Sequence, residues 1–248
     1  MVTVVHQTDL YRPHQDPDDH WDLACQYALA KLGRQRLGGI LLDYPYEGGP
    51  GDPDICAIAQ MNRICGMNVP YGIGAEPGKT LSQAAELLLS VLAESPVPVA
   101  VHIVGSCIDV ALALNAQPER FERNCAAIYL HAGAAQDDRQ LEYNVALAPW
   151  AYARVHAAPC PVYWLPCFHR VPDWGKEDMR IGKHGTFYRF VQGDILRELP
   201  PRVQNYFLYM FTRCANPRYL MALEQPVDKA ALAQYSAQAR NMWCTAGL

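Results

Sequence analysis

The sequence predicts an α/β fold, built as an open and mostly parallel sheet flanked by helices. Short apolar runs rich in valine, isoleucine and leucine alternate along the first two thirds of the chain with segments of helical apolar spacing. Strands that alternate with helices form βαβ units, and the sheets of such units are parallel. Half of the 248 residues are apolar, which is enough material for one large core.

Six apolar runs are expected to form the strands of this sheet. In chain order they lie at 2–7, 38–43, 69–73, 97–104, 126–130 and 161–165. Each run is short and rich in β-branched or other apolar residues, as strands buried on both faces are. Functional loops of such sheets lie at the carboxyl ends of the strands, so site residues are expected there.

The segments between these runs are expected to form helices, at 21–32, 54–65, 80–92, 106–115, 118–123 and 149–156. Gly66 directly follows the second of them, as glycine often follows the end of a helix. In the last third, 166–183 reads as a loop, and helices are expected at 187–199, 203–213 and 230–248. We interpret residues 1–248 as a single domain with a helical C-terminal part, and the apolar terminus is consistent with a chain shortened at that end.

Composition excludes several functional classes. The 21 basic residues are balanced by 25 acidic ones, so neither a basic tail for nucleic acid nor a disordered acidic tail is expected. No apolar run reaches the roughly 18 residues of a membrane span. The first residues lack the basic start of a signal peptide, and the nine cysteines contain no C-x-x-C pair. We therefore expect a cytoplasmic protein with reduced, mostly structural thiols.

Five carboxylates crowd the segment after the first predicted strand: Asp9, Asp16, Asp18, Asp19 and Asp22. Carboxylates this close repel one another, and a hard divalent cation would relieve the repulsion. Ca²⁺ accepts a large, irregular cage of oxygen ligands, although the spacing is not that of an EF-hand loop. The alternative is a solvated acidic turn whose aspartates cap the next helix.

The run Val4-Val-His-Gln-Thr-Asp9, followed by Asp16-Pro-Asp-Asp19, resembles the N-terminal aspartate motif of the nucleoside hydrolases. These enzymes, of the inosine–uridine-preferring type, are calcium-dependent N-ribohydrolases with an open α/β fold. Further segments agree in order and spacing, at 105–114, 118–121, 127–133, 141–144 and 148–151. The sequence is thus similar to a divergent, C-terminally short member of that family over about residues 2–166.

The resemblance implies roles for individual residues. Asp9 would ligate Ca²⁺ and accept a proton from the water that the ion activates. Asp19 would be the second carboxylate ligand, and Val104 would contribute its backbone carbonyl oxygen. The substrate ribose would be held by four further residues: Gln7, Asp18, Glu142 and Asn144.

Structural interpretations of the same residues remain open. Asp18 and Asp19 could simply cap a helix, and Glu142 and Asn144 could form a surface turn. Three histidines near strand ends could protonate a leaving base or be structural: His14, His20 and His131.

Three features depart from the family pattern. Gln7 stands where the family has a carboxylate, Gln136 lies near an expected asparagine, and 241–246 contains neither the late histidine nor the late aspartate. That aspartate completes the calcium site in the family, and the histidine aids the leaving group.

The leading hypothesis is a calcium-dependent hydrolase that cleaves the N-glycosidic bond of a ribonucleoside or related ribosyl compound, in purine or pyrimidine metabolism. The first alternative is a vestigial ligand-binding member without turnover, because the late His-Asp pair is absent. The second is a metal-dependent phosphoesterase that uses the same aspartates. These interpretations imply a small-molecule substrate and a homo-oligomer. They imply neither a nucleic-acid partner nor a membrane partner.

Overall fold

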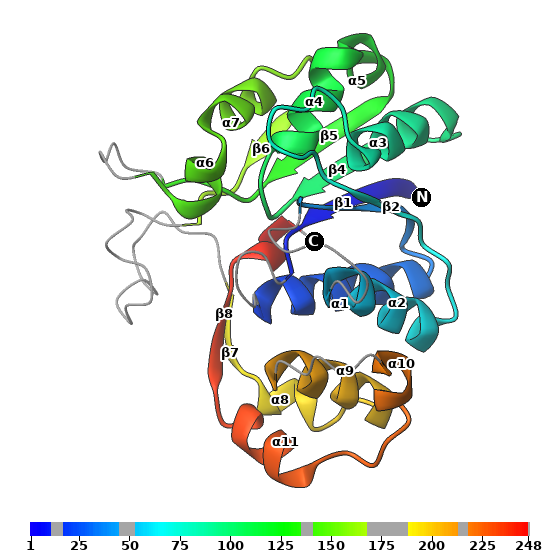
Figure 1. Cartoon of the computed structure of the whole chain (residues 1–248), viewed down its shortest axis with the longest axis vertical. Helices are drawn as coiled ribbons and strands as arrows, with labels where there is room; N and C mark the ends of the chain where they lie inside the picture. Colours follow the sequence, from blue (N-terminus) through cyan, green and yellow to red (C-terminus); the bar gives the residue numbers. More distant parts are fainter. Residues whose placement is uncertain (11–16, 45–52, 135–140, 168–187, 213–217, 248) are drawn as a thin grey trace.

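The computed structural model describes residues 1–10, 17–44, 53–134, 141–167, 188–212 and 218–247. A six-stranded sheet, in the order β3-β2-β1-β4-β5-β6, runs through the centre (Figure 1). Its strands are β1 (Val2–Thr8), β2 (Gln35–Leu42), β3 (Tyr71–Ile73), β4 (Val99–Ile103), β5 (Cys125–Leu130) and β6 (Val162–Trp164). Every neighbouring pair is parallel, which confirms the predicted fold class.

Helices cover both faces of the sheet. The first seven are α1 (Pro17–Lys31), α2 (Pro53–Cys65), α3 (Gln83–Glu94), α4 (Ile108–Ala116), α5 (Pro118–Asn124), α6 (Tyr143–Leu147) and α7 (Pro149–His156). Helices α3, α4, α5 and α7 lie on one side of the sheet, and α1 and α2 lie on the other (Figure 1). Among the described residues, no helix combines the length and the apolar character needed to cross a membrane.

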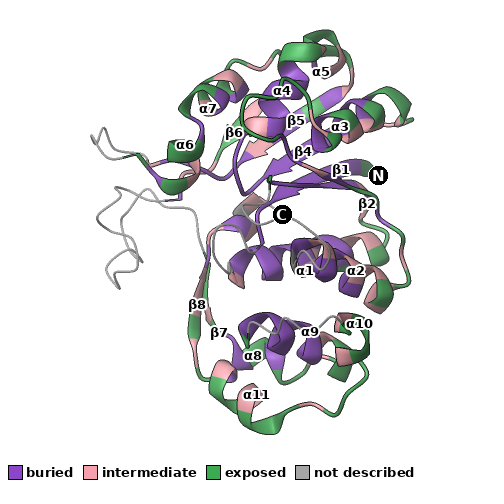
Figure 2. Cartoon of the chain, in the orientation of Figure 1, coloured by how far each residue is buried: buried purple, intermediate pink, exposed green. Residues whose placement is uncertain are grey.

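Two hydrophobic cores follow from this arrangement, one on each face of the sheet. Successive side chains of a strand point to opposite faces. Leu41 therefore packs in the core beneath α3 and α4, whereas Ile40 and Leu42 pack in the core beneath α1 and α2. The central strands are accordingly buried along their length (Figure 2).

Beyond α1 and α2 lies a further helical layer (Figure 1). It contains α8 (Gly193–Leu196), α9 (Pro201–Phe211), α10 (Tyr219–Ala222) and α11 (Lys229–Ser236). The apolar face of α9 extends the core of α1 and α2 through Tyr206, Phe207 and Met210. This layer covers an aromatic surface that would otherwise face water.

The C-terminal part differs from the sequence-based expectation. Within 187–199 a strand, β7 (Tyr188–Val191), precedes α8. Within 230–248, α11 is followed by β8 (Ala239–Met242) and the 3₁₀ helix η3 (Cys244–Gly247). The predicted long helices are wrong here because β7 and β8 pair with each other, antiparallel, across a large sequence separation.

The start of α1 also differs, since the helix begins at Pro17 rather than near Trp21. Proline suits the first helical position because its missing N–H would have no partner there. Asp18 and Asp19 consequently lie in the first turn of α1, where the helix dipole favours negative charge. The acidic segment is therefore helical from Pro17 onward, and residues 11–16 lie outside the described part.

We predict that Gly72→Ala destabilises the protein. A Cβ there would lie 2.6 Å from the Gln83 carbonyl oxygen and 2.7 Å from the Ala84 Cα. These are backbone atoms, so β3 and α3 must move apart, and the free energy of unfolding should fall by about 1–3 kcal/mol. Gly39→Ala is the matched control, because its Cβ would meet the rotatable Leu87 side chain at 3.0 Å. Equal losses for both variants in urea denaturation would contradict this packing.

Candidate active site

Polar residues converge at the carboxyl ends of β1 and β4. The strand order reverses between these two strands, and ligands of open α/β sheets bind at such a point. Asp9 directly follows β1, and Gly105 lies just beyond β4. The first turn of α1 brings Asp18 and Asp19 to the same edge. All three aspartates are buried.

Asp19 joins the first turn of α1 to the end of β1. Its Oδ2 accepts hydrogen bonds from the Thr8 hydroxyl at 2.5 Å and from the Asp9 backbone N–H at 3.3 Å. Bonds of this kind to a carboxylate are stronger than those between neutral groups. The Asp19 carboxylate is thus held against the Asp9 backbone, next to the residue that the resemblance implied as its partner in a metal site.

Cys244 of η3 closes this edge from the C-terminal end of the chain. Its thiol lies 2.8 Å from Asp19 Oδ1 and 3.2 Å from Asp18 Oδ2, and the two oxygens share its single S–H. The Trp243 backbone N–H also donates to Asp18 Oδ2, at 3.2 Å. Sequence reasoning compared 241–246 with the family's late His-Asp segment but assigned no residue there. The structure shows that a thiol faces the two aspartates.

Gln7, the amide that replaces a family carboxylate, has both ends of its side-chain amide engaged. Its Nε2 donates to Asp43 Oδ1 at 2.6 Å, and its Oε1 accepts from the Gly105 N–H at 3.0 Å. Asp43 also accepts from the Ser106 N–H and hydroxyl, both at 2.8 Å. An amide can bridge a carboxylate and an N–H because it is donor and acceptor at once.

Gly105 permits these close contacts. A Cβ at this position would lie 2.8 Å from Gln7 Nε2, 3.0 Å from Asp43 Oδ2 and 3.2 Å from Asp9 Cβ. The three side chains therefore surround one glycine. Asp43 was missed as a site residue by the sequence analysis, although its place at the end of the second strand was a usable signal.

The other implied residues form a second group around Val104. The Val104 carbonyl oxygen accepts a hydrogen bond from Asn144 Nδ2 at 3.0 Å. Glu142 is the N-cap of α6 and accepts from the Asn144 N–H at 3.0 Å and the Gly133 N–H at 2.8 Å. Glu142 is buried, so the alternative of a simple surface turn does not describe it.

The histidines considered as proton donors fall into two groups. His131 is buried, with Nδ1 3.1 Å from the Trp243 carbonyl oxygen and Nε2 3.0 Å from His102 Nε2. Burial lowers the pKa of His131 to about 4. It is therefore neutral near pH 7, and both its ring nitrogens are engaged. His20 is buried against the Tyr206 ring, and His14 and Gln136 lie outside the described residues.

A cavity of about 480 Å³ opens beside this site. Asp43, Ser106 and Asp109 contribute polar groups to it, and Tyr143 and Trp150 contribute aromatic rings. Its volume lies in the range of small-molecule pockets. Burial raises the pKa of Asp109 to about 7, and the nearby charge of Asp43 adds to this rise.

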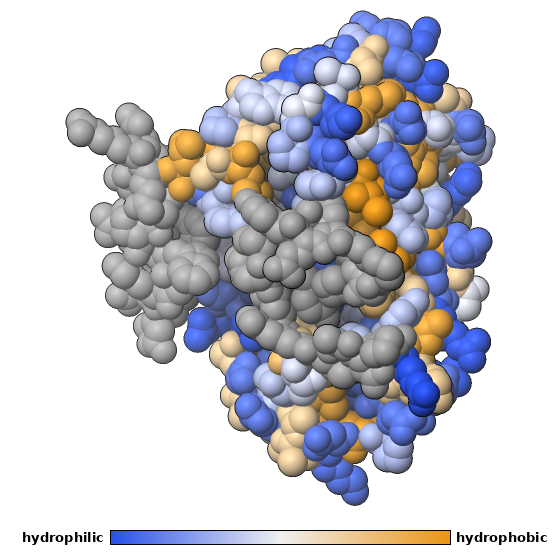
Figure 3. Space-filling view, in the orientation of Figure 1, coloured by the Kyte–Doolittle hydropathy of each residue, from blue (hydrophilic) through white to orange (hydrophobic). Residues whose placement is uncertain are grey.

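The surface around α6 and α7, whose residues line part of this cavity, is partly apolar. Four large side chains there are well exposed: Leu141, Tyr143, Leu147 and Trp150. Hydrophobic side chains are visible where α6 lies, next to a more hydrophilic surface (Figure 3). An apolar rim and a polar floor suit a ligand with one apolar and one hydroxyl-rich part.

The donor set at the strand ends fits Ca²⁺ in part. Asp9, Asp18 and Asp19 offer carboxylate oxygens, and Val104 offers a backbone carbonyl oxygen. Hard oxygen atoms of this kind are the ligands that Ca²⁺ prefers. The Cys244 thiol is a soft donor that suits Ca²⁺ poorly.

No protein-family model and no curated protein matches the sequence. Solved structures match the fold. A purine-preferring ribonucleoside hydrolase from Gardnerella vaginalis is similar with a TM-score of 0.58 and 15% identity, covering 94% of this chain and 79% of that one. The chain has the nucleoside hydrolase fold. The fold expected from the aspartate motif is thus confirmed.

Two further nucleoside hydrolase structures support the same fold. The plant enzyme PpNRh1 is similar with a TM-score of 0.52 and 15% identity, covering 94% of this chain and 71% of that one. An inosine-guanosine nucleoside hydrolase is similar with a TM-score of 0.51 and 16% identity, covering 66% of this chain. The match spans 59% of the length of that protein.

We predict that Gln7→Glu destabilises the nucleoside hydrolase fold, because it sets a second carboxylate against Asp43 in a buried site. The free energy of unfolding should fall by about 1–3 kcal/mol. Adding Asp43→Asn exchanges amide and carboxylate and should recover most of the loss. A double-mutant cycle by urea denaturation measures this coupling. Additive losses would show that the two side chains do not interact.

Proposed function

We propose that this protein is a hydrolase that cleaves the N-glycosidic bond of a ribonucleoside or a related ribosyl compound with the help of Ca²⁺. One observation carries the proposal: Asp9, Asp18 and Asp19 converge, buried, at the point of the nucleoside hydrolase fold where the strand order reverses. Buried carboxylates are costly unless they are paired, hydrogen-bonded or used to bind a cation. The similar solved structures carry the names of nucleoside hydrolases.

Asp9, Asp19 and the Val104 carbonyl oxygen would hold the calcium ion. Val104 accepts one hydrogen bond from Asn144, and a carbonyl oxygen has a second lone pair for a ligand bond. When bound, calcium supplies a site at which a water molecule is oriented and its pKa lowered. Asp9 would accept the proton that this water loses, and Asp19 would keep Asp9 in place through the Asp9 N–H.

Asp18, Glu142 and Asn144 would hold the ribose by hydrogen bonds. An oxocarbenium-like transition state develops positive charge on the sugar, and nearby carboxylates stabilise such charge. We assign Gln7 a positioning role, because its amide is already engaged by Asp43 and Gly105. The adjoining cavity would receive the remainder of the substrate.

The leaving base would depart without help from His131, which is neutral and fully engaged. General acid catalysis contributes about 10²- to 10⁴-fold where it operates. Substrates whose base leaves readily should therefore be preferred over those that need protonation.

A second candidate function is ligand binding without turnover. Cys244 favours it, because the thiol faces Asp18 and Asp19 in the segment where the resemblance implied a further carboxylate ligand. A site with fewer oxygen donors should bind Ca²⁺ more weakly.

We predict that the protein releases ribose from a panel of purine and pyrimidine nucleosides in the presence of CaCl₂. Release should stop with EGTA and resume when calcium is restored. Asp9→Ala should lower kcat by about 10²- to 10⁴-fold, since it removes the proton acceptor. Asp194→Ala, at an exposed position of α8, is the matched control and should retain full activity.

No release by folded wild-type protein would overturn the hydrolase proposal. Ribose or nucleoside binding that Asp18→Ala abolishes would then support the binding function. Release that persists in Asp9→Ala would instead place the proton acceptor elsewhere.

We predict that Cys244→Asp strengthens calcium binding, because it replaces a soft donor with a carboxylate beside Asp18 and Asp19. A tenfold gain in affinity corresponds to about 1.4 kcal/mol. In saturating CaCl₂ the calcium-induced rise in Tm should exceed that of wild type by about 3–6 °C. Cys244→Ser is the control that adds no charge. If Cys244→Asp shows the same calcium-induced rise in Tm as wild type, residue 244 does not contact the ion.

A further inference from the structure

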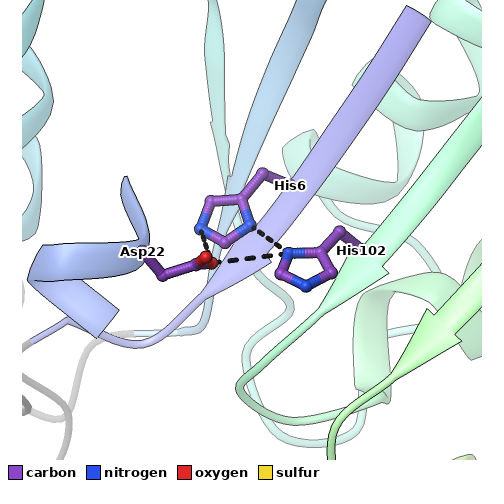
Figure 4. A group of neighbouring side chains, drawn as sticks. All are labelled: His6, Asp22 and His102. Atoms are coloured by element: carbon purple, nitrogen blue, oxygen red, sulfur yellow. Dashed lines mark hydrogen bonds and ion pairs between the residues drawn. The ribbon is translucent and has the colours of Figure 1, made fainter. Parts of the chain in front are cut away.

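A second cluster of ionisable side chains lies in the core, between the sheet and α1. It consists of His6 on β1, His102 on β4 and Asp22 on α1 (Figure 4). The exposed fractions of the three residues are 0%, 3% and 0%. None of them belongs to the set Asp9, Asp18, Asp19 and Val104, and the inference below does not rest on the proposed function.

Hydrogen bonds fix where the protons of the imidazoles lie. The Trp243 carbonyl oxygen can only accept, so the proton of His131 is on Nδ1, 3.1 Å away. His131 Nε2 is therefore an acceptor, and it receives the Nε2–H of His102 at 3.0 Å. His102 Nδ1 is then an acceptor, and it receives the Nδ1–H of His6 at 3.1 Å. The remaining nitrogen, His6 Nε2, carries a lone pair.

This order of protons leaves the lone pair of His6 Nε2 facing a carboxylate, while the single lone pair of His102 Nδ1 accepts the His6 Nδ1–H. His6 Nε2 lies 3.5 Å from Asp22 Oδ2, and His102 Nδ1 lies 3.4 Å from the same oxygen. Among the described residues, neither oxygen of Asp22 nor His6 Nε2 has a hydrogen-bond partner. His6 Nε2 and the Asp22 carboxylate are both acceptors, and acceptors that face one another in a dry interior repel unless a cation lies between them.

The imidazoles themselves do not supply that cation. Burial lowers the pKa of His6 to about 3, and it lowers the pKa of His102 well below its ordinary value. Both rings are thus neutral near pH 7, which is the form in which histidine ligates metals. Burial also raises the pKa of Asp22, so an unpaired carboxylate here is unfavourable.

We propose that His6 Nε2, His102 Nδ1 and an Asp22 oxygen bind one divalent transition-metal ion such as Zn²⁺. The ion would take the lone pair of His102 Nδ1 in place of the His6 Nδ1–H. In a tetrahedral zinc site the ligand atoms are about 2.0–2.2 Å from the ion and hence about 3.3–3.6 Å from one another. The distances of 3.5 Å and 3.4 Å from Asp22 Oδ2 to the two nitrogens fall within that range. Two imidazoles and a carboxylate suit a zinc-like ion better than Ca²⁺.

Gln26 supplies the fourth ligand. Its side-chain amide lies 3.1 Å from His102 Nδ1, and the residue is buried. Amide oxygen and nitrogen differ by a half-turn, so reversing the amide brings its oxygen to the ion. Gln35 contacts the other amide atom at 2.6 Å and reverses with it, which keeps that hydrogen bond but gives up the 3.3 Å bond from Gln35 Nε2 to the Gln26 carbonyl oxygen.

The ion would be structural, because the cluster is closed to solvent and leaves no position for a substrate. His131 would not bind the ion itself. It accepts the His102 Nε2–H and so orients the ring of that ligand. Bound to β1, β4 and α1 together, the ion would fix α1 on the sheet. The first turn of α1 carries Asp18 and Asp19, so the ion would also position the candidate active site.

The test is zinc analysis of the purified 248-residue chain after equilibration with ZnCl₂ and removal of unbound metal. We expect about one zinc per chain in wild type and none in Asp22→Asn or His102→Gln. Cys244→Ser should keep its zinc, which distinguishes this cluster from the group Asp18, Asp19 and Cys244. Stripping the wild type with dipicolinate should lower Tm by about 5–10 °C, and ZnCl₂ should restore it.

Substitution with Co²⁺ provides a readout that does not depend on the variants folding. A tetrahedral visible spectrum without a thiolate charge-transfer band would support nitrogen and oxygen ligands. A thiolate band, or zinc lost from Cys244→Ser but kept by Asp22→Asn, would place the ion at the other group and overturn the proposal. Wild type that folds, binds no zinc and shows no rise in Tm with ZnCl₂ would also overturn it, because a proton on Asp22 would then relieve the repulsion between the carboxyl group and His6 Nε2.

Discussion

The bond between the first turn of α1 and the end of β1 is the constraint on which the candidate site depends. Asp19 accepts hydrogen bonds from the Thr8 hydroxyl and the Asp9 N–H, and so joins a helix start to a strand end. Because Asp19 also meets Cys244, the same carboxylate connects the N-terminal and C-terminal parts of the chain.

Several further carboxylates are buried around this connection. Asp9, Asp18, Asp19, Asp22 and Asp43 are all buried at or beneath one edge of the sheet. Charge removed from water costs free energy, so each carboxylate needs donors or a cation. Asp43 has donors in Gln7 and Ser106, and Asp19 has the Thr8 hydroxyl and the Asp9 N–H. Asp22 faces the lone pair of His6 Nε2, which explains why a second cation is inferred at that depth.

The nucleoside hydrolase fold explains why these groups share one edge. In a parallel sheet the carboxyl ends of all strands point the same way, and the reversal between β1 and β4 leaves room for a ligand. Glycine at position 105 keeps that room open, since a side chain there would collide with Gln7, Asp43 and Asp9. Glu142 adds rigidity from the far side by capping α6 and holding the turn at Gly133.

Much of the central fold followed from local pattern. Six apolar runs match β1 to β6 within a few residues, because strands buried on both faces read as continuous apolar segments. Asp9, Asp18 and Asp19 could be chosen from the aspartate motif alone. Local pattern failed at β7 and β8, whose pairing depends on a partner about fifty residues away, and at the short helix α6.

The sequence by itself determined the α/β class, the order of the elements and the aspartate-rich edge, because each depends on periodicity or on residues close in the chain. Only the tertiary structure decided that Cys244 faces Asp18 and Asp19. It also decided that Gln7 is hydrogen-bonded to Asp43, and that His6, His102 and Asp22 lie together. Those contacts join residues from separate elements. Their distances are set by how the strands order in the sheet and how α1 packs on it, which no local pattern encodes.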